Sequence, residues 1–145
     1  MNLKIGFIGM SHLGLNSAAA AAEMKFNVFC YDNNINLIKN LDNGICNVKE
    51  PNLESILKKK KNKINFTSNI KNILACDIIY ISGDIPTNDK GVSQLQEIRL
   101  ILNTLSKLIT NNTILIILSQ IPPGFTRSIK NLFKKQVKIY YQVET

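Results

Sequence analysis

The first 32 residues constrain the fold of this chain more than any other segment. A short apolar run at residues 4–8 leads into Gly9 and Gly14, and an alanine-rich stretch follows. A second apolar run at residues 26–31 ends at Asp32. A strand, a glycine turn, a helix, a second strand and an acidic residue within about 30 residues are typical of a dinucleotide-binding unit. We therefore predict a dinucleotide site at the end of the first strand.

The two glycines of this turn have different steric roles. Gly9 permits the tight turn out of the strand, and Gly14 removes a side chain where the helix packs on the sheet. Between them, the first turn of the helix presents unpaired backbone N–H groups and the positive end of its dipole. Both features attract a pyrophosphate.

Ser11 stands where the G-x-G-x-x-G pattern has its middle glycine. Its Cβ and hydroxyl therefore lie where bare backbone normally approaches phosphate. Because serine is small and its hydroxyl can donate to an anion or cap the helix, we expect a modified site that still binds phosphate.

Asp32 lies at the carboxyl end of the second predicted strand. A carboxylate there can accept hydrogen bonds from both ribose hydroxyls of a dinucleotide. Two alternatives stay open. Asp32 could cap the next helix instead, and the whole pattern could be an ordinary tight turn with a surface aspartate.

Length and composition set the limits for other classes of protein. The 145 residues suffice for one domain with a sizeable core. No apolar run approaches the ~20 residues needed to span a bilayer, and the N-terminus shows no signal-peptide pattern, so we expect a cytoplasmic protein without membrane contact. The three cysteines lack a C-x-x-C pair, which favours reduced, packed thiols over disulfides or a metal site.

The net charge of +8 raises the alternative of nucleic-acid binding, as does the lysine-rich run at residues 58–63. However, Arg99 and Arg127 are the only arginines among the 18 basic residues, whereas lysine, asparagine and isoleucine are abundant throughout. The lysine run follows an amphipathic stretch, where it is most simply the solvated end of a helix. We therefore expect no nucleic-acid partner.

Strands and helices alternate along the rest of the chain, without a linker or an internal repeat to divide it. Pro51 suits the first turn of a helix, and Gly44 suits the end of one. A β-branched run at residues 113–118 is expected at the centre of the sheet. Further strands are predicted at 64–66, 77–82 and 137–141, and helices at 34–43, 52–60, 69–74, 95–109 and 126–135.

This alternation predicts a Rossmann-type α/β fold, a doubly wound parallel sheet forming a single domain over residues 1–145. In such folds, ligands bind outside the carboxyl ends of the strands. The loops that begin at Gly9, Asp32, Gly83 and Ser119 each follow a predicted strand. We expect all four to converge on one crevice.

Several segments together carry a family resemblance. They are residues 8–15, the pair Tyr31 and Asp32, residues 50–53, residues 84–88 with Gly91, and residues 119–124, in which Pro-Pro-Gly follows a buried strand. The chain resembles the N-terminal NAD-binding domain of the UDP-glucose/GDP-mannose dehydrogenase family from Leu3 to Glu144. This family oxidises the C6 alcohol of a nucleotide sugar to a carboxylate with two NAD per substrate and a cysteine-bound intermediate.

The resemblance implies an NAD site and assigns roles within it. Gly9, Ser11, His12, Leu13 and Gly14 would hold the pyrophosphate, Asp32 with Asn33 the adenosine ribose, and Gly83, Asp84, Ile85, Pro86, Ser119 and Gln120 the nicotinamide half. Two residues match positions near the reacting centre. Glu144 matches a glutamate that borders nicotinamide and substrate, and Gln120 replaces a threonine associated with the chemistry.

Three departures from the family pattern fall in ligand-facing loops: Ser11, the segment 83–86 in place of V-P-T-P, and Gln120. They indicate an altered substrate or altered phosphate contacts. Simpler interpretations also stay open for several residues. His12 could be a surface residue, Glu50 with Pro51 a structural loop and cap, Arg127 a helix-surface residue, and Asp84 an acceptor for backbone N–H groups of its own turn.

By this resemblance the chain would lack the family's lysine- and asparagine-bearing helix, its dimerising helix and its catalytic-cysteine domain. We therefore expect residues 1–145 to be inactive alone and the full-length enzyme to be a homodimer acting on a nucleotide sugar, with a monomer as an option for this chain. The alternative is a non-catalytic nucleotide-binding module or truncated gene product.

Overall fold

Six short parallel strands form one sheet in the computed structural model, which describes residues 3–110, 112–134 and 137–143. The strand order is β3-β2-β1-β4-β5-β6, so the chain starts in the middle and builds outward in both directions. This confirms the predicted doubly wound sheet. The strands are β1 (Lys4–Ile8), β2 (Asn27–Tyr31), β3 (Ile64–Thr67), β4 (Ile78–Ile81), β5 (Ile114–Ile117) and β6 (Lys138–Tyr141).

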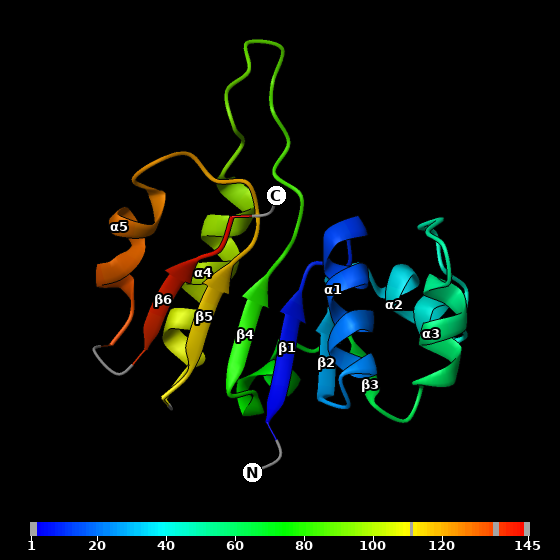
Figure 1. The fold of residues 1–145 in the computed structure, drawn as a ribbon. Helices are drawn as coiled ribbons and strands as arrows, with labels where there is room; N and C mark the ends of the chain where they lie inside the picture. Colours follow the sequence, from blue (N-terminus) through cyan, green and yellow to red (C-terminus); the bar gives the residue numbers. More distant parts are fainter. Residues whose placement is uncertain (1–2, 111, 135–136, 144–145) are drawn as a thin grey trace.

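The helices divide between the two faces of the sheet (Figure 1). Right-handed crossovers from β1 towards β3 place their helices on one face, and crossovers from β4 towards β6 place theirs on the other. The first set is α1 (His12–Glu23), α2 (Ile35–Asp42) and α3 (Leu53–Lys59). The second set is α4 (Gln96–Leu108), α5 (Phe125–Ile129) and the 3₁₀ turn η2 (Lys130–Leu132). The 3₁₀ helix η1 (Ile70–Ala75), which connects β3 to β4, packs on this second face as well.

Each face of the sheet has its own hydrophobic core. Under α1, the buried Ala18, Ala19 and Ala22 let the helix approach β1 and β2 closely. On the opposite face, Leu102 and Leu105 of α4 are fully buried against β4 and β5. None of the helices within the described ranges is long and apolar enough to cross a membrane.

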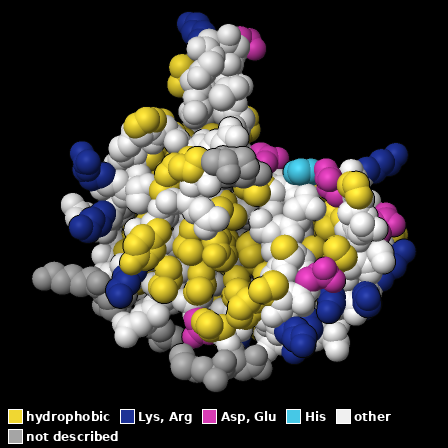
Figure 2. Space-filling view, viewed as in Figure 1, with side chains coloured by type: hydrophobic (Ala, Val, Ile, Leu, Met, Phe, Trp, Pro, Cys, Tyr) yellow, Lys and Arg dark blue, Asp and Glu magenta, His cyan; other side chains and the backbone are white. Residues whose placement is uncertain are grey.

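The burial and position of β5 differ from the prediction that residues 113–118 lie at the centre of the sheet. Alternate residues of β5 point to opposite faces; Leu115 and Ile117 are fully buried, whereas Ile114 and Ile116 are only half-buried. Figure 1 shows no described helix in front of β4, β5 and β6, and Figure 2 shows hydrophobic side chains gathered there. β5 lies inside the sheet but not at its centre, which belongs to β1 and β4.

Several element boundaries also differ from the prediction. The helix predicted at 126–135 becomes α5 and then η2, because the chain turns back towards β6 and buries Phe133 in the core. Pro51 precedes α3 in a turn, and Asn52 adopts a left-handed conformation with φ 65°, so α3 begins at Leu53. Gly44, with φ 77°, follows α2 as predicted.

Candidate functional site

The turn between β1 and α1 packs backbone directly on backbone. Gly9 has φ 96°, and a Cβ added to it would lie 2.5 Å from the Cα and N of Gly83. A Cβ on Gly14 would lie 2.0 Å from the Gly9 carbonyl oxygen and 2.8 Å from Ser82 Oγ. Any larger residue at either position would force these segments apart. The two glycines therefore set the start of α1 close against the carboxyl ends of β1 and β4.

Ser11 is the N-cap residue of α1, but its side chain does not cap the helix. The Ser11 hydroxyl donates to the Ser82 carbonyl at 2.9 Å, and thereby ties the turn to the end of β4. The capping role suggested by the sequence is therefore wrong. The backbone of Ser11 accepts from the Leu15 N–H at 3.0 Å. The preceding N–H groups of the first turn have no carbonyl of their own helix to bind, which leaves them for an anion.

Two buried serines brace the same region. The Ser82 hydroxyl lies 3.1 Å from both the Ile8 and Gly9 carbonyl oxygens. The Ser119 hydroxyl donates to the Gly83 carbonyl at 2.6 Å. These contacts join the carboxyl ends of β1, β4 and β5, so the loops that leave them keep a fixed spacing. Ser119 therefore acts here as a brace for the Gly83 backbone.

Asp32 joins the ends of β1 and β2. Its Oδ2 accepts from the Met10 N–H at 2.8 Å, and its Oδ1 accepts from the Asn34 N–H at 2.9 Å. The N-cap of α2 is Asn34, whose side chain accepts from the Leu37 N–H at 3.0 Å. Helix capping, the alternative role for Asp32, is thus performed by its neighbour. Each carboxylate oxygen retains a second acceptor site, since it has two lone pairs.

The four predicted loops meet at a cavity of about 370 Å³ at the carboxyl edge of the sheet. This volume falls in the range of ligand pockets, roughly 300–1,000 Å³. The sequence-predicted residues that line it are Gly9, Ser11, Asp32, Asn33, Gly83, Asp84, Ile85, Pro86 and Ser119. His12, Leu13 and Gln120 line an adjoining hollow of about 320 Å³. Gly14 lines neither cavity and is buried beneath the turn.

Sequence reasoning missed part of the lining. Leu37 of α2 and three residues of α4 also border the larger cavity: Glu97, Ile98 and Ile101. Only one signal could have identified the α4 residues. Glu97 and Ile101 are four residues apart and therefore share a face of that helix. The sequence alone did not show that this face turns towards the crevice.

The charges around the larger cavity are acidic. Asp32, Asp84 and Glu97 line it, and no lysine or arginine does so within the described residues. Burial raises the pKa of Tyr31, and the neighbouring Asp32 raises it further. Because no lysine or arginine of the described residues lines this cavity, a phosphate bound there must rely on backbone N–H groups. No described residue donates a hydrogen bond to the exposed Asp84 carboxylate. The interpretation of Asp84 as an acceptor for backbone N–H groups of its own turn therefore has no support.

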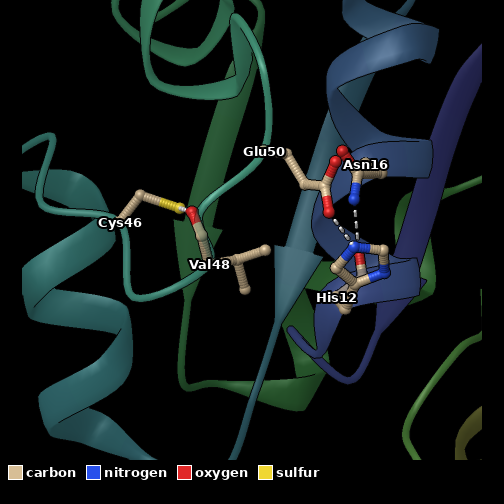
Figure 3. Close-up of polar contacts among 5 residues, drawn as sticks. All are labelled: His12, Asn16, Cys46, Val48 and Glu50. Atoms are coloured by element: carbon tan, nitrogen blue, oxygen red, sulfur yellow. Dashed lines mark hydrogen bonds and ion pairs between the residues drawn. The ribbon is translucent and has the colours of Figure 1, made fainter.

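His12 makes a contact that the sequence did not suggest. Its Nε2 lies 2.5 Å from Glu50 Oε1, and Figure 3 shows the two side chains pointing towards each other from α1 and from the loop before α3. The Asn16 side chain donates to the His12 carbonyl at 2.9 Å. Earlier in the same loop, Cys46 Sγ lies 3.3 Å from the Val48 carbonyl oxygen. The contact between His12 and Glu50 fastens this loop to the start of α1.

The other chemically reactive residues offer no second site in the described part of the chain. Burial is the main cause that raises the pKa of Cys30 and that of Cys76, the latter to about 12, so both stay protonated near neutral pH. No group of His, Cys, Asp and Glu among the described residues could hold a metal ion. Gln120 is exposed. Glu144 lies outside the described residues.

Comparison with known proteins gives one consistent result. Residues 3–144 match the model of the UDP-glucose/GDP-mannose dehydrogenase family, NAD binding domain. UDP-glucose 6-dehydrogenase TuaD of Bacillus subtilis is 28% identical over 97% of this chain and 31% of its own length. UDP-N-acetyl-D-mannosamine dehydrogenase of Pyrococcus horikoshii is 24% identical over 91% of this chain and 32% of its own.

Solved structures agree in fold. The UDP-D-ManNAc dehydrogenase structure from Pyrococcus horikoshii superposes with a TM-score of 0.89 at 22% identity, over 99% of this chain and 36% of that one. GDP-mannose dehydrogenase from Pseudomonas aeruginosa gives 0.88 at 19% identity, over 100% and 36%. The chain thus spans about a third of the length of these relatives.

Proposed function

Because this chain belongs to the UDP-glucose/GDP-mannose dehydrogenase family and matches its NAD-binding domain, we propose that the 370 Å³ crevice binds NAD on behalf of a nucleotide-sugar 6-dehydrogenase. The observation that carries the proposal is the junction of β1, α1 and β2. There, a free helix N-terminus lies beside a carboxylate at the end of the next strand. One group suits a pyrophosphate and the other a ribose.

The residues present fit a dinucleotide. Gly9 and Gly14 keep the backbone of the turn free of side chains, and a Cβ at either would displace neighbouring backbone. In this proposal, the N–H groups of His12 and Leu13 face the pyrophosphate. Asp32 accepts from the ribose hydroxyls while it still holds the Met10 N–H. The dipole of α1 offsets part of the negative charge of the phosphates, since no lysine or arginine lines the larger cavity within the described residues.

The nicotinamide half is assigned to the loops that leave β4 and β5. Gly83 to Pro86 would border it on one side and Ser119 with Gln120 on the other, at the adjoining hollow. NAD would supply the hydride acceptor for oxidation of the sugar alcohol. Glu144 and Gln120 are the proposed residues near the reacting carbon. The nucleotide-sugar substrate and the homodimer of the full-length enzyme belong to the same proposal.

The test is direct binding and turnover with residues 1–145. We expect NAD to bind weakly, because the family's further domains would normally add contact area over the cofactor. We expect no NADH from UDP-glucose or UDP-N-acetylmannosamine, because residues 1–145 span only about a third of the length of the dehydrogenases they match. Calorimetry measures the first expectation and absorbance at the NADH band the second. A folded chain that binds no NAD at millimolar concentration would contradict the proposal.

A further inference from the structure

Beyond Asp32, the larger cavity continues into an apolar recess on the α4 side of the sheet. Ile8 and Ile81, at the ends of β1 and β4, and Ile98 of α4 are 1–3% exposed, and Ile101 is half-buried. A ribose held by Asp32 would place its base towards this recess. Flat aromatic bases bind in such apolar recesses, with few polar groups to fix their orientation.

Glu97 is the ionisable residue that α4 contributes to this recess. It precedes the buried Ile98 and lies one helical turn before Ile101, so it shares the face of α4 that borders the cavity. No described lysine, arginine or histidine forms an ion pair with it. Its position in the first turn of α4 suits the helix dipole, which is the simpler explanation for an acid there.

The chemistry of a carboxylate gives Glu97 a more specific role. An ionised carboxylate only accepts hydrogen bonds. The adenine ring carries an exocyclic amino group, which donates, whereas hypoxanthine carries a carbonyl oxygen at the same place. A carboxylate beside that position would attract the first base and repel the second.

We propose that Glu97 is a specificity residue of the crevice, which accepts a hydrogen bond from the adenine amino group of the dinucleotide. This inference rests on the proposed function, because it requires NAD to bind with its base in the recess of α4. It goes further by assigning the choice of base to one side chain.

The experiment compares two ligands, NAD and nicotinamide hypoxanthine dinucleotide, by calorimetry on residues 1–145. The unaltered chain should prefer NAD by about tenfold, as expected for a hydrogen bond to a charged group at an open site. In Glu97→Gln the side-chain amide can donate to the carbonyl oxygen. Its preference for NAD should fall to about twofold or less, chiefly because the hypoxanthine ligand binds more tightly.

Glu54→Gln is the matched control, because Glu54 is likewise an exposed glutamate in the first turn of a helix and lies outside the crevice. It should leave the ratio of the two affinities unchanged. A ratio that Glu97→Gln leaves unchanged, with NAD still bound, would overturn the role of Glu97 and leave the proposed function intact. Absence of NAD binding by the folded, unaltered chain would instead overturn the proposed function and this inference with it.

Discussion

Two segments border the same crevice but are built in opposite ways. The glycine turn, residues 9–14, packs against the ends of β1 and β4 so closely that its glycines admit no Cβ. The exit loop, residues 83–94, projects from the end of β4 into solvent (Figure 1), where Gly91 has no neighbour within 4 Å of an added Cβ and Val92 is 58% exposed. The exit loop is held mainly by its own hydrogen bonds, several of them to Asn88.

The contrast indicates where the site is rigid and where it can adapt. Polar groups of the glycine turn have fixed positions before any ligand arrives, which lowers the entropic cost of binding. Beyond Pro86 the exit loop is mainly exposed, so its sequence there can change with little effect on the sheet. Substitutions should therefore have large effects in the turn and small effects in the loop.

The largest difference is expected between Gly14→Ala and Gly91→Ala. In the first variant, the new methyl group overlaps the Gly9 carbonyl, so the free energy of unfolding should fall by about 3 kcal/mol or more and NAD binding should be lost. In the second, only the left-handed backbone, with φ 72°, is strained, which costs about 1–2 kcal/mol. Urea unfolding and calorimetry measure both quantities. Equal destabilisation by the two variants would contradict the comparison.

Ser11 tests the space available to the phosphates. Ser11→Gly loses the hydrogen bond to Ser82 but opens the turn, so NAD affinity should stay within about tenfold, or ~1.4 kcal/mol. Ser11→Leu fills the space that a pyrophosphate needs and should abolish binding. Val92→Leu, in the exit loop, is the control for added volume and should bind NAD normally. Full binding by the Ser11→Leu variant would show that the phosphates lie elsewhere.

The next comparison is between the effects of replacing two carboxylates of the crevice, Asp32 and Asp84, on cofactor binding. Asp32→Ala loses the proposed ribose contacts and should weaken NAD binding by roughly 1.5–3 kcal/mol. The unaltered chain should prefer NAD over NADP, because Asp32 repels a 2′-phosphate and the following Asn33 and Asn34 supply no positive charge. Asp32→Ala should reduce that preference. Asp84→Ala should change NAD affinity by less than about threefold, since Asp84 is exposed.

Titrating both cofactors against these variants decides between the two acids. NADP binding to the unaltered chain as tightly as NAD would remove Asp32 from the proposed site. A larger loss of NAD affinity in Asp84→Ala than in Asp32→Ala would place the main polar contact with NAD in the exit loop.

The last effect is absent at neutral pH and concerns the core on the α4 face of the sheet, where Cys76 lies beside Gly6 of β1. Burial raises the pKa of Cys76 from 9.0 in the unfolded chain to about 12, with Asp77 adding to the rise and Lys4 opposing it. The unfolded thiol therefore ionises first as pH increases. The free energy of unfolding should be independent of this thiol below pH 9 and should fall between pH 9 and about 12.

Urea unfolding at a series of pH values measures this decline. Cys76→Ala should make the decline shallower, and Cys46→Ala, in the half-exposed loop after α2, is the matched control. An unchanged slope in Cys76→Ala would show that the Cys76 thiol contributes nothing to the pH dependence.

Local sequence patterns predicted most of the fold because each one reports a short-range constraint. The glycine spacing predicted the β1–α1 turn, and the apolar runs predicted all six strands. Sequence patterns predicted less well the features that depend on contacts between residues far apart in the sequence. The run at residues 113–118 is apolar on both sides, yet only one side of β5 is fully buried, because α4 and α5 both pack on the same face. The helix at 126–135 ended early because Phe133 turns into the core.

Sequence patterns alone predict the doubly wound sheet, the convergence of four loops and the family, since these depend on periodicity and on motifs within single loops. Which groups those motifs contact depends on tertiary packing. It directed the Ser11 hydroxyl to Ser82, paired His12 with Glu50, and brought Glu97 to the crevice. Each of these contacts joins elements 38 or more residues apart or depends on how a helix is rotated against the sheet. Only the packing of the whole domain fixes such relations.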